Sequence, residues 1–421
     1  MRRGQIVAVM ICILLNALDG FDVLSISFAS PGIAAQWRVD RAALGVVLSM
    51  ELIGMAGGSI LLGTLCDRWG RRPTILTCLL VMGIGMSLAS VANSIASLSL
   101  FRLFTGVGIG GMLAATNAAT AEFANARHRD LAVALMAAGY PFGAVVGGSM
   151  ASVLLVTHSW RSIFVLGATA SFVAIPFVLF LLPETVAFLG RRQQPDALQR
   201  VNRALRLLSH APVERLSPPD PGALKGAPLR QLFSPTLRRT TFCLMLAYVA
   251  QILTFYFILK WTPKIVVDMG FAPSMAGTVL VWANIGGLAG SIALSLLTRV
   301  APLRWLTLGS MILSTMLVAL FGRSAPDLHQ LALLAAIAGF CTNAGMVGLY
   351  ALVAASFPSE ARASGTGLVI GIGRGGAALS PVLAGLLFQA GVSLPTVALV
   401  MAFGSIIAAA AVFGMRPIRS R

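Results

Sequence analysis

The chain has 421 residues, of which 57% are hydrophobic and only 11% are charged. Because a soluble domain carries about 25% charged residues, a soluble enzyme, a secreted disulfide scaffold and a disordered chain are excluded. The net charge of +17 comes from 28 arginines and 3 lysines, and most of them lie in short gaps between apolar runs. This distribution indicates membrane topology, with the lipid bilayer rather than nucleic acid as the partner of these charges.

Twelve apolar runs are long enough to cross a bilayer, which takes about 20 residues in a helix. Only helices satisfy their own backbone segment by segment in lipid, and the runs are too long for barrel strands. The sequence therefore predicts an all-α membrane protein. The first run has a basic start but no cleavage site, so we expect it to be retained as the first helix. The expected spans cover residues 5–30, 42–65, 73–93, 96–123, 129–157, 161–183, 239–262, 273–298, 303–321, 328–356, 362–389 and 394–415.

Basic residues are divided unevenly between the two sides of these spans. If the N-terminus is cytoplasmic, the inside segments hold 23 of the 31 basic residues, the outside loops hold 5, and 3 lie within spans. An excess of arginine and lysine in cytoplasmic loops is the rule for membrane proteins. We therefore expect both termini in the cytoplasm. We also expect a monomer, in a bacterial inner membrane.

One long polar stretch divides the spans six and six. The expected organisation is an N-terminal six-helix bundle (1–183), a cytoplasmic central loop (184–238) and a C-terminal six-helix bundle (239–421). An offset of 234 residues aligns the segment that starts at Ala121 with the one that starts at Ala355, as a weak internal repeat. Transporters built from such repeats bind substrate between the halves, near the membrane midplane.

The first span carries a polar stripe on an otherwise apolar helix. Asn16, Asp19, Asp22 and Ser25 recur every third residue, and helix geometry places the two acids at or just beyond the bilayer centre. Two partly desolvated carboxylates one turn apart repel each other, so at least one should hold a proton near neutral pH. The pair suits a proton-coupled carrier. The alternative is a structural role as ion-pair partners of cations in other spans.

Further charged residues lie inside spans: Arg102, Lys260 and Arg374 as cations, and Glu51 as an acid. A charge within a span is costly, so each must face a cavity or an opposite charge. We expect protonation of the acids to leave the cations available for a carboxylate ligand. Glu51 is either an additional protonation site or the ion-pair partner of the nearby outer arginines, Arg38 or Arg41.

Aromatic side chains near the expected cavity are candidates to sandwich a ring, although lipid-facing or core positions are an equal alternative. The full set of candidate substrate-binding residues is Asp22, Arg102, Tyr140, Tyr256, Lys260, Trp282 and Arg374.

Between the second and third spans, the pattern G-x-x-x-D-R-x-G-R-R, from Gly63 to Arg72, resembles the signature loop of the major facilitator superfamily. Asp67 is expected to pair with basic groups across the inner face, and Gly63 to permit close helix approach. In the fourth span, R-x-x-x-G-x-G-x-G from Arg102 resembles the second motif of the superfamily. The resemblance implies two pseudo-symmetric six-helix bundles and alternating access. From the residues, we expect no enzyme activity, cofactor or metal. The residues assigned to a conformational gate are Gly63, Asp67, Arg68, Gly70, Arg71, Arg72, Glu122 and Arg362.

The sequence DGFD in the first span resembles the D-G-x-D signature of the aromatic acid:proton symporter family, within the same superfamily. LPETVAFL, PLRQLF, the WTP that ends the seventh span, and RASGTGLVIGIGRGGAALSP agree with it along the chain. The resemblance implies import of an aromatic carboxylate with protons, and it associates transport with Asp19, Asp22, Arg102, Arg362 and Arg374. Lys260 departs from the small polar residue expected before Trp261.

Other functions remain open at this level. A proton symporter of non-aromatic organic anions, such as sugar acids or dicarboxylates, is the main alternative. Efflux is disfavoured, because GYPFGAVVGG in the fifth span only partly resembles the antiporter signature. A membrane sensor is disfavoured because it would need a soluble domain to relay a signal, and we expect none here. A membrane enzyme is disfavoured because the four histidines have no metal-site or triad spacing.

Overall fold

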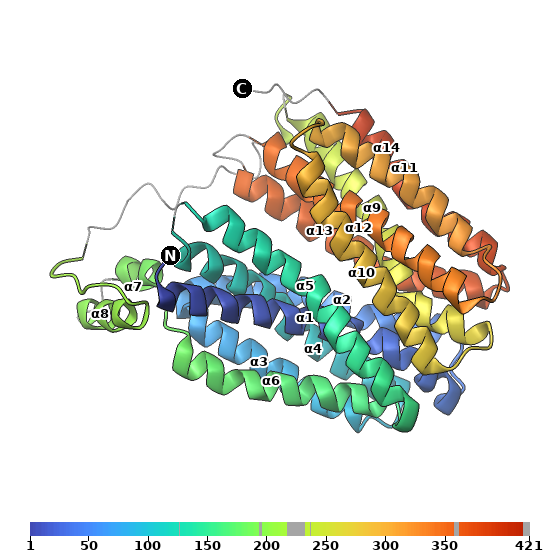
Figure 1. Cartoon of the computed structure of the whole chain (residues 1–421), viewed down its shortest axis with the longest axis horizontal. Coiled ribbons are helices and arrows are strands. Elements are labelled where there is room, and N and C mark those ends of the chain that lie inside the picture. The colour runs from blue at the N-terminus through green and yellow to red at the C-terminus, as the bar shows by residue number, and fades with distance from the viewer. Residues whose placement is uncertain (126, 193–195, 217–231, 236, 358–361, 416–421) are drawn as a thin grey trace. The chain divides into compact units, whose positions relative to one another are not determined.

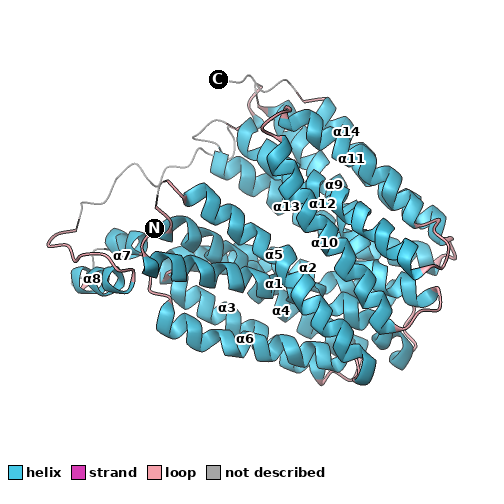
Figure 2. Ribbon diagram, viewed as in Figure 1, coloured by secondary structure: helices cyan, strands magenta, loops and turns pink. Residues whose placement is uncertain are grey.

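The structure is a computed structural model that describes residues 1–125, 127–192, 196–216, 232–235, 237–357 and 362–415. The described residues form helices joined by short loops, with no strand among them (Figures 1 and 2). The helices are α1 (Arg3–Trp37), α2 (Arg41–Trp69), α3 (Arg71–Ser90), α4 (Ile95–Phe123), α5 (Arg129–Thr157), α6 (Arg161–Leu181), α7 (Val186–Arg192), α8 (Ala197–Leu207), α9 (Arg238–Asp268), α10 (Pro273–Leu297), α11 (Leu303–Phe321), α12 (Leu328–Ser356), α13 (Arg362–Gln389) and α14 (Leu394–Phe413).

Twelve of these helices are long and apolar enough to cross a membrane, all except the short α7 and α8. The prediction of twelve spanning helices is therefore confirmed, and most bounds differ from the expected ones by a few residues. The largest extensions are those of α1, which continues to Trp37, and α9, which continues to Asp268. The expectation that the WTP sequence ends the seventh span is wrong, since Pro263 lies inside α9.

The chain forms two compact units, and α1, α2 and α5 each contribute residues to both. The division into two six-helix bundles joined by the central loop, which the sequence analysis proposes, stays a prediction. The first unit comprises Met1–Ser25, Ile53–Gly147 and Arg161–Gly222, and the second comprises Ile26–Leu52, Gly148–Trp160 and Ala223–Arg421.

In the first unit, glycines allow α2 and α4 to pack backbone against backbone. A Cβ at Gly58 would overlap the carbonyl oxygen of Val107, and one at Gly110 would overlap that of Met55. Small residues at helix interfaces are the usual means of close packing in lipid, where no hydrophobic effect drives helices together. The same unit holds α3, which packs against both α4 and α6.

In the second unit, α9 contacts α10, α12, α13 and α14. The tightest approach joins α10 to α12, where a Cβ at Gly286 would overlap the carbonyl oxygen of Ala336. The approach is reciprocal, because a Cβ at Gly339 on α12 would overlap the carbonyl oxygen of Ala283. Backbone, unlike a flexible side chain, has little room to shift at these positions.

We expect Gly286→Val to destabilise the folded protein by about 1–3 kcal/mol, the usual cost of overpacking a well-packed site. The measurement is the thermal transition of the detergent-purified protein, with size-exclusion chromatography after heating as the readout of the remaining folded fraction. Gly309→Val on α11 is the matched control, because a Cβ at Gly309 meets nothing within 4 Å. Equal transitions for the two variants would contradict the prediction.

Two equivalent glycines of the internal repeat have equivalent neighbours, each within its own unit. Gly139 on α5 packs against α1, where its Cβ would lie 2.6 Å from the carbonyl oxygen of Ile13. Gly373 on α13 packs against α9, where a Cβ would overlap the ring of Tyr248. Because α1 and α9 each open a set of six spans, this correspondence supports the repeat found in the sequence.

The described part of the central loop includes α7 and α8, which pack against each other. Their apolar faces form a small core of Phe188, Leu189, Val201 and Ala204. The apolar residues of α8 recur at helical spacing, with arginines between them. This pattern is typical of an amphipathic helix.

Candidate functional site

The two acids of α1 are buried within the first unit. Asp19 is 1% exposed and Asp22 is fully buried. Between them lies Gly20, where a Cβ would overlap the carbonyl oxygen of Tyr140 on α5. The missing side chain at Gly20 thus brings the backbone of Tyr140 against the helical turn that carries both acids.

Arg102 on α4 reaches the same turn of α1. Its Nη2 donates to the carbonyl oxygen of Asp22 at 2.9 Å, and its guanidinium carbon lies 5.4 Å from the centroid of the Phe164 ring. Arg102 is completely buried, and a buried cation in a spanning helix is retained where polar partners stabilise it. The structure therefore brings together Asp22 and Arg102, as the candidate site requires.

Room for the Asp22 carboxylate comes from α6. A Cβ at Gly167 would lie 2.8 Å from Asp22 Oδ1, tighter than an ordinary contact. The Arg102 Nη1 lies 2.9 Å from the sulfur of Met86 on α3. Residues of α1, α3, α4, α5 and α6 thus surround the acid–guanidinium cluster, which we define as Asp19, Asp22 and Arg102.

In the second unit, Lys260 on α9 forms an ion pair with Glu51 on α2. The Nζ–Oε2 distance is 3.4 Å and both side chains are fully buried. The alternative that pairs Glu51 with Arg41 is wrong, since Arg41 instead pairs with Asp268, at 3.3 Å, and Arg38 is exposed. Glu51 lies ten residues along α2 from Arg41, about 15 Å at the rise of a helix, which is too far for a direct contact.

The remaining candidate substrate residues of the second unit differ in their surroundings. Tyr256 lies one turn before Lys260 on α9 and is 9% exposed. Arg374 on α13 is partly buried, and it follows Gly373, where a Cβ would overlap the ring of Tyr248 on α9. Trp282 on α10 is 46% exposed, so the structure does not place it among the buried groups.

Arg71, at the start of α3, is the centre of the predicted gate motif. Its Nη2 pairs with Glu122 Oε1 of α4 at 2.8 Å, and its Nη1 pairs with Asp67 Oδ1 at 3.2 Å. The Arg71 side chain is 8% exposed, whereas that of Asp67 is 76% exposed. The motif therefore ties α2, α3 and α4 together through the buried arginine, and the ion pair of Asp67 is local, four residues apart.

Glu184 is a residue of this region that the sequence analysis did not assign. Its carboxylate accepts from the backbone N–H groups of Arg71 at 3.0 Å and Arg72 at 3.2 Å, at the N-terminus of α3, where a negative charge is favourable. Gly70 has φ 109° and lies against this carboxylate, so a side chain there would be strained. Burial raises the pKa of the Glu184 carboxyl, although the backbone donors oppose this shift. The signal in the sequence was LPET, which follows the sixth span.

Other gate residues fit the motif less closely. The prediction that Gly63 permits close helix approach is wrong, because a Cβ there would lie 3.8 Å from that of Ala114, an ordinary contact. Gly54 and Gly58 of α2 make the close approach instead. Arg68 is exposed. Arg362 begins α13, and its side chain lies outside the described part of the chain.

We expect Arg71→Gln to cost about 3 kcal/mol of folding free energy, the lower end for loss of one partner from a mostly buried ion pair. The reason is that Glu122, with a side chain 17% exposed, would lose its guanidinium. Thermal unfolding of the detergent-purified variant measures this effect. The control is Arg68→Gln, which removes the same charge from an exposed position of the same motif and should leave the transition near that of the wild type.

Twelve spanning helices that carry buried acids and cations define a membrane transporter, because such charges in lipid-embedded helices mark substrate and ion pathways. The chain belongs to the Major Facilitator Superfamily, whose family profile matches residues 10–324 and 244–421. It is an integral membrane protein, as the family and the spanning helices require.

Named relatives extend over almost the whole chain. The chain is 30% identical to the gallate transporter of Pseudomonas putida, over 99% of this chain and 93% of the relative. It is also 30% identical to the 3-(3-hydroxy-phenyl)propionate transporter of Escherichia coli K12, over 98% of this chain and 94% of the relative. The chain is 29% identical to the 4-hydroxybenzoate transporter PcaK of Pseudomonas putida, over 90% of this chain and 85% of the relative.

Solved structures share the fold. The xylose transporter XylE from E. coli, in a partially occluded inward-open conformation, has a TM-score of 0.75 and 15% identity, and the match covers 99% of this chain and 98% of that one. A crystal structure of the D-xylose-proton symporter gives the same TM-score with 16% identity and 98% coverage of both chains. The prediction of the major facilitator fold is confirmed.

Proposed function

We propose that this protein is a proton-coupled secondary transporter that imports an aromatic carboxylic acid by alternating access. The observation that carries the proposal is the acid–guanidinium cluster, in which Asp19, Asp22 and Arg102 are buried in one spanning bundle. The names of the relatives supply the substrate class, since gallate, hydroxyphenylpropionate and 4-hydroxybenzoate are all aromatic carboxylates.

Arg102 is the proposed anchor for the substrate carboxylate. A guanidinium keeps its charge at any physiological pH and binds a carboxylate with two parallel hydrogen bonds. Arg102 donates to the backbone carbonyl of Asp22, on the same turn of α1 as the acid, so a proton on that acid lowers the local negative charge and favours the anionic ligand. Loss of the proton restores the charge and favours release. Proton and substrate binding are thereby coupled through one cluster.

Glu51 and Lys260 are proposed to form a second proton-sensitive pair. Both are fully buried at an Nζ–Oε2 distance of 3.4 Å, so protonation of Glu51 would leave the ammonium charge of Lys260 available to an anion. Tyr140 and Tyr256 remain the candidates for contact with the aromatic ring. Exposure of Trp282 argues for a peripheral role at most.

The membrane, the orientation and the oligomeric state of the protein are proposed from the sequence. The excess of arginine in alternate loops favours both termini in the cytoplasm and a bacterial inner membrane. A monomer of two six-helix halves, 1–183 and 239–421, is the simplest form that provides alternating access. In this form, the Arg71–Glu122 pair stabilises the cytoplasmic gate, and Arg362 is the proposed counterpart in the second half.

Uptake into proteoliposomes with an imposed pH gradient tests the proposal. Labelled 4-hydroxybenzoate should accumulate when the interior is alkaline, and a protonophore should abolish the accumulation. Unlabelled benzoate-type acids should compete, whereas sugar acids and dicarboxylates should not. Competition by the non-aromatic acids alone would overturn the aromatic assignment, and accumulation that ignores the protonophore would overturn the proton coupling.

A further inference from the structure

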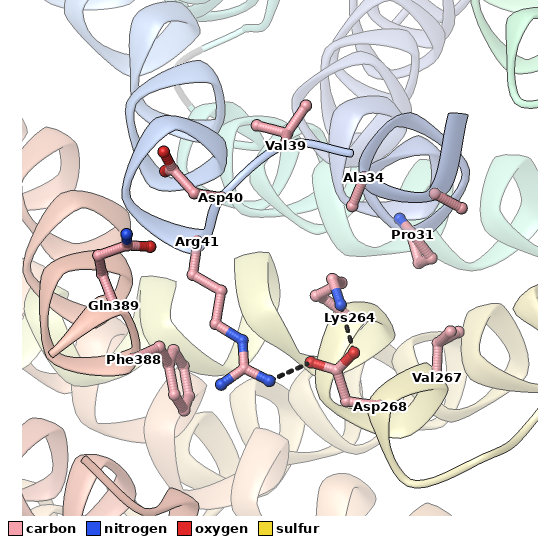
Figure 3. Close-up of a pocket in the computed structure, with 11 residues that line it drawn as sticks. Pro31, Ala34, Val39, Asp40, Arg41, Lys264, Val267, Asp268, Phe388 and Gln389 are labelled. Carbon is pink, nitrogen blue, oxygen red and sulfur yellow. Dashed lines mark hydrogen bonds and ion pairs between the residues drawn. The ribbon is translucent and has the colours of Figure 1, made fainter. Parts of the chain in front are cut away.

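The second unit contains a cavity of about 530 Å³ beside the turn where α1 ends and α2 begins. Its volume is within the usual range for small-molecule sites, about 300–1,000 Å³. Figure 3 shows polar and apolar side chains around it from α1, α2, α9 and α13. None of these residues belongs to the acid–guanidinium cluster or to the Glu51–Lys260 pair.

A carboxylate is bound at one side of this cavity by two cations. Asp268, the last residue of α9, forms ion pairs with Arg41 Nη2 at 3.3 Å and with Lys264 Nζ. Figure 3 shows the two cations reaching the two oxygens of Asp268 from different helices. The Lys264 side chain is 15% exposed, whereas those of Arg41 and Asp268 are 45% and 34% exposed. The cavity therefore already provides the charges that recognise a carboxylate, and solvent reaches them.

An aromatic ring adjoins these charges. The guanidinium carbon of Arg41 lies 5.5 Å from the centroid of the Phe388 ring, a distance at which cations and rings attract. The remaining walls include Pro31, Val39 and Val267. The second acid of the cavity, Asp40, is engaged elsewhere, because its Oδ1 accepts from the backbone N–H of Ala43 at 2.7 Å.

We propose that this cavity is an outer recognition site for aromatic carboxylates, in which Arg41 and Lys264 bind the substrate carboxylate in exchange for Asp268. The inference rests on the proposed function and its orientation, which place the loop between α1 and α2 outside the cell. While no substrate is present, Asp268 forms ion pairs with both cations. An arriving acid presents the same chemical group, together with a ring that packs against the apolar wall and Phe388.

The proposal predicts opposite effects for changes on the two sides of the ion pair. Arg41→Gln and Lys264→Gln remove a cation that binds substrate, so each should raise the apparent KM for uptake, by about tenfold for one charge-assisted hydrogen bond. Asp268→Asn removes the competing carboxylate, so it should lower the apparent KM. If the ion pair only holds two helices together, all three variants break it and should shift KM in the same direction.

The experiment is concentration-dependent uptake of labelled 4-hydroxybenzoate into proteoliposomes by the full-length wild type and the three variants. Arg38→Gln is the charge-matched control, because Arg38 lies three residues before Arg41 and does not line the cavity; its KM should equal that of the wild type. Wild-type uptake with opposite KM shifts for Arg41→Gln and Asp268→Asn supports the site. Wild-type uptake with equal or absent shifts overturns the site alone, whereas a wild type that takes up no aromatic acid overturns the proposed function and the site with it.

Discussion

Asp22→Asn is expected to abolish proton-driven accumulation of substrate while leaving substrate exchange in place. Asparagine has nearly the shape of a protonated aspartate but never releases a proton, so the variant mimics one state of the cycle permanently. A gradient of one pH unit provides about 1.4 kcal/mol per coupled proton, enough for roughly tenfold accumulation by the wild type. The variant should only equilibrate the labelled acid, with a ratio of inside to outside near one.

Proteoliposomes measure both processes, because an imposed pH gradient drives net uptake and a preloaded unlabelled acid drives exchange. Ser25→Ala is the matched control. The Ser25 hydroxyl donates to the backbone carbonyl of Asp22 at 2.6 Å, so this change alters the same turn of α1 and spares the carboxylate. Full gradient-driven uptake by Asp22→Asn would remove Asp22 from the coupling role and leave Asp19 as the acid to test.

The fold could be predicted from the sequence because hydrophobic length alone determines a spanning helix. Where the apolar run and the helix diverge, the prediction failed. α9 passes through Pro263 and ends at Asp268, since a proline inside a spanning helix can be accommodated by neighbouring groups. α1 likewise passes through Pro31 and continues to Trp37.

The site was predicted in part. Asp19, Asp22 and Arg102 were found because charges in apolar runs are costly and therefore conspicuous. Contacts between distant residues could not be predicted in the same way. Glu51 and Lys260, for example, are separated by 209 residues, and no periodicity relates them. The Arg41–Asp268 pair was hidden for a further reason: both residues lie at helix ends, where charges are ordinary.

The buried Glu51–Lys260 pair leads to the second large effect. We expect Glu51→Gln and Lys260→Met each to destabilise the protein by about 3–5 kcal/mol, because either change leaves the other charge buried without its ion-pair partner. Both side chains are fully buried, so solvent does not compensate. Glu51→Gln should also change the pH dependence of uptake, since it removes a proposed protonation site.

The double variant Glu51→Gln, Lys260→Met separates the two contributions. Replacement of both members leaves no uncompensated buried charge, so the double variant should be more stable than either single variant. Thermal unfolding in detergent measures the order of the three. If the double variant is as unstable as the sum of the single ones, the two residues act independently and the ion pair does not couple α2 to α9. If stability is restored but the pH dependence of uptake stays changed, the pair serves transport rather than folding, which is the role that a carrier coupled to protons would require of it.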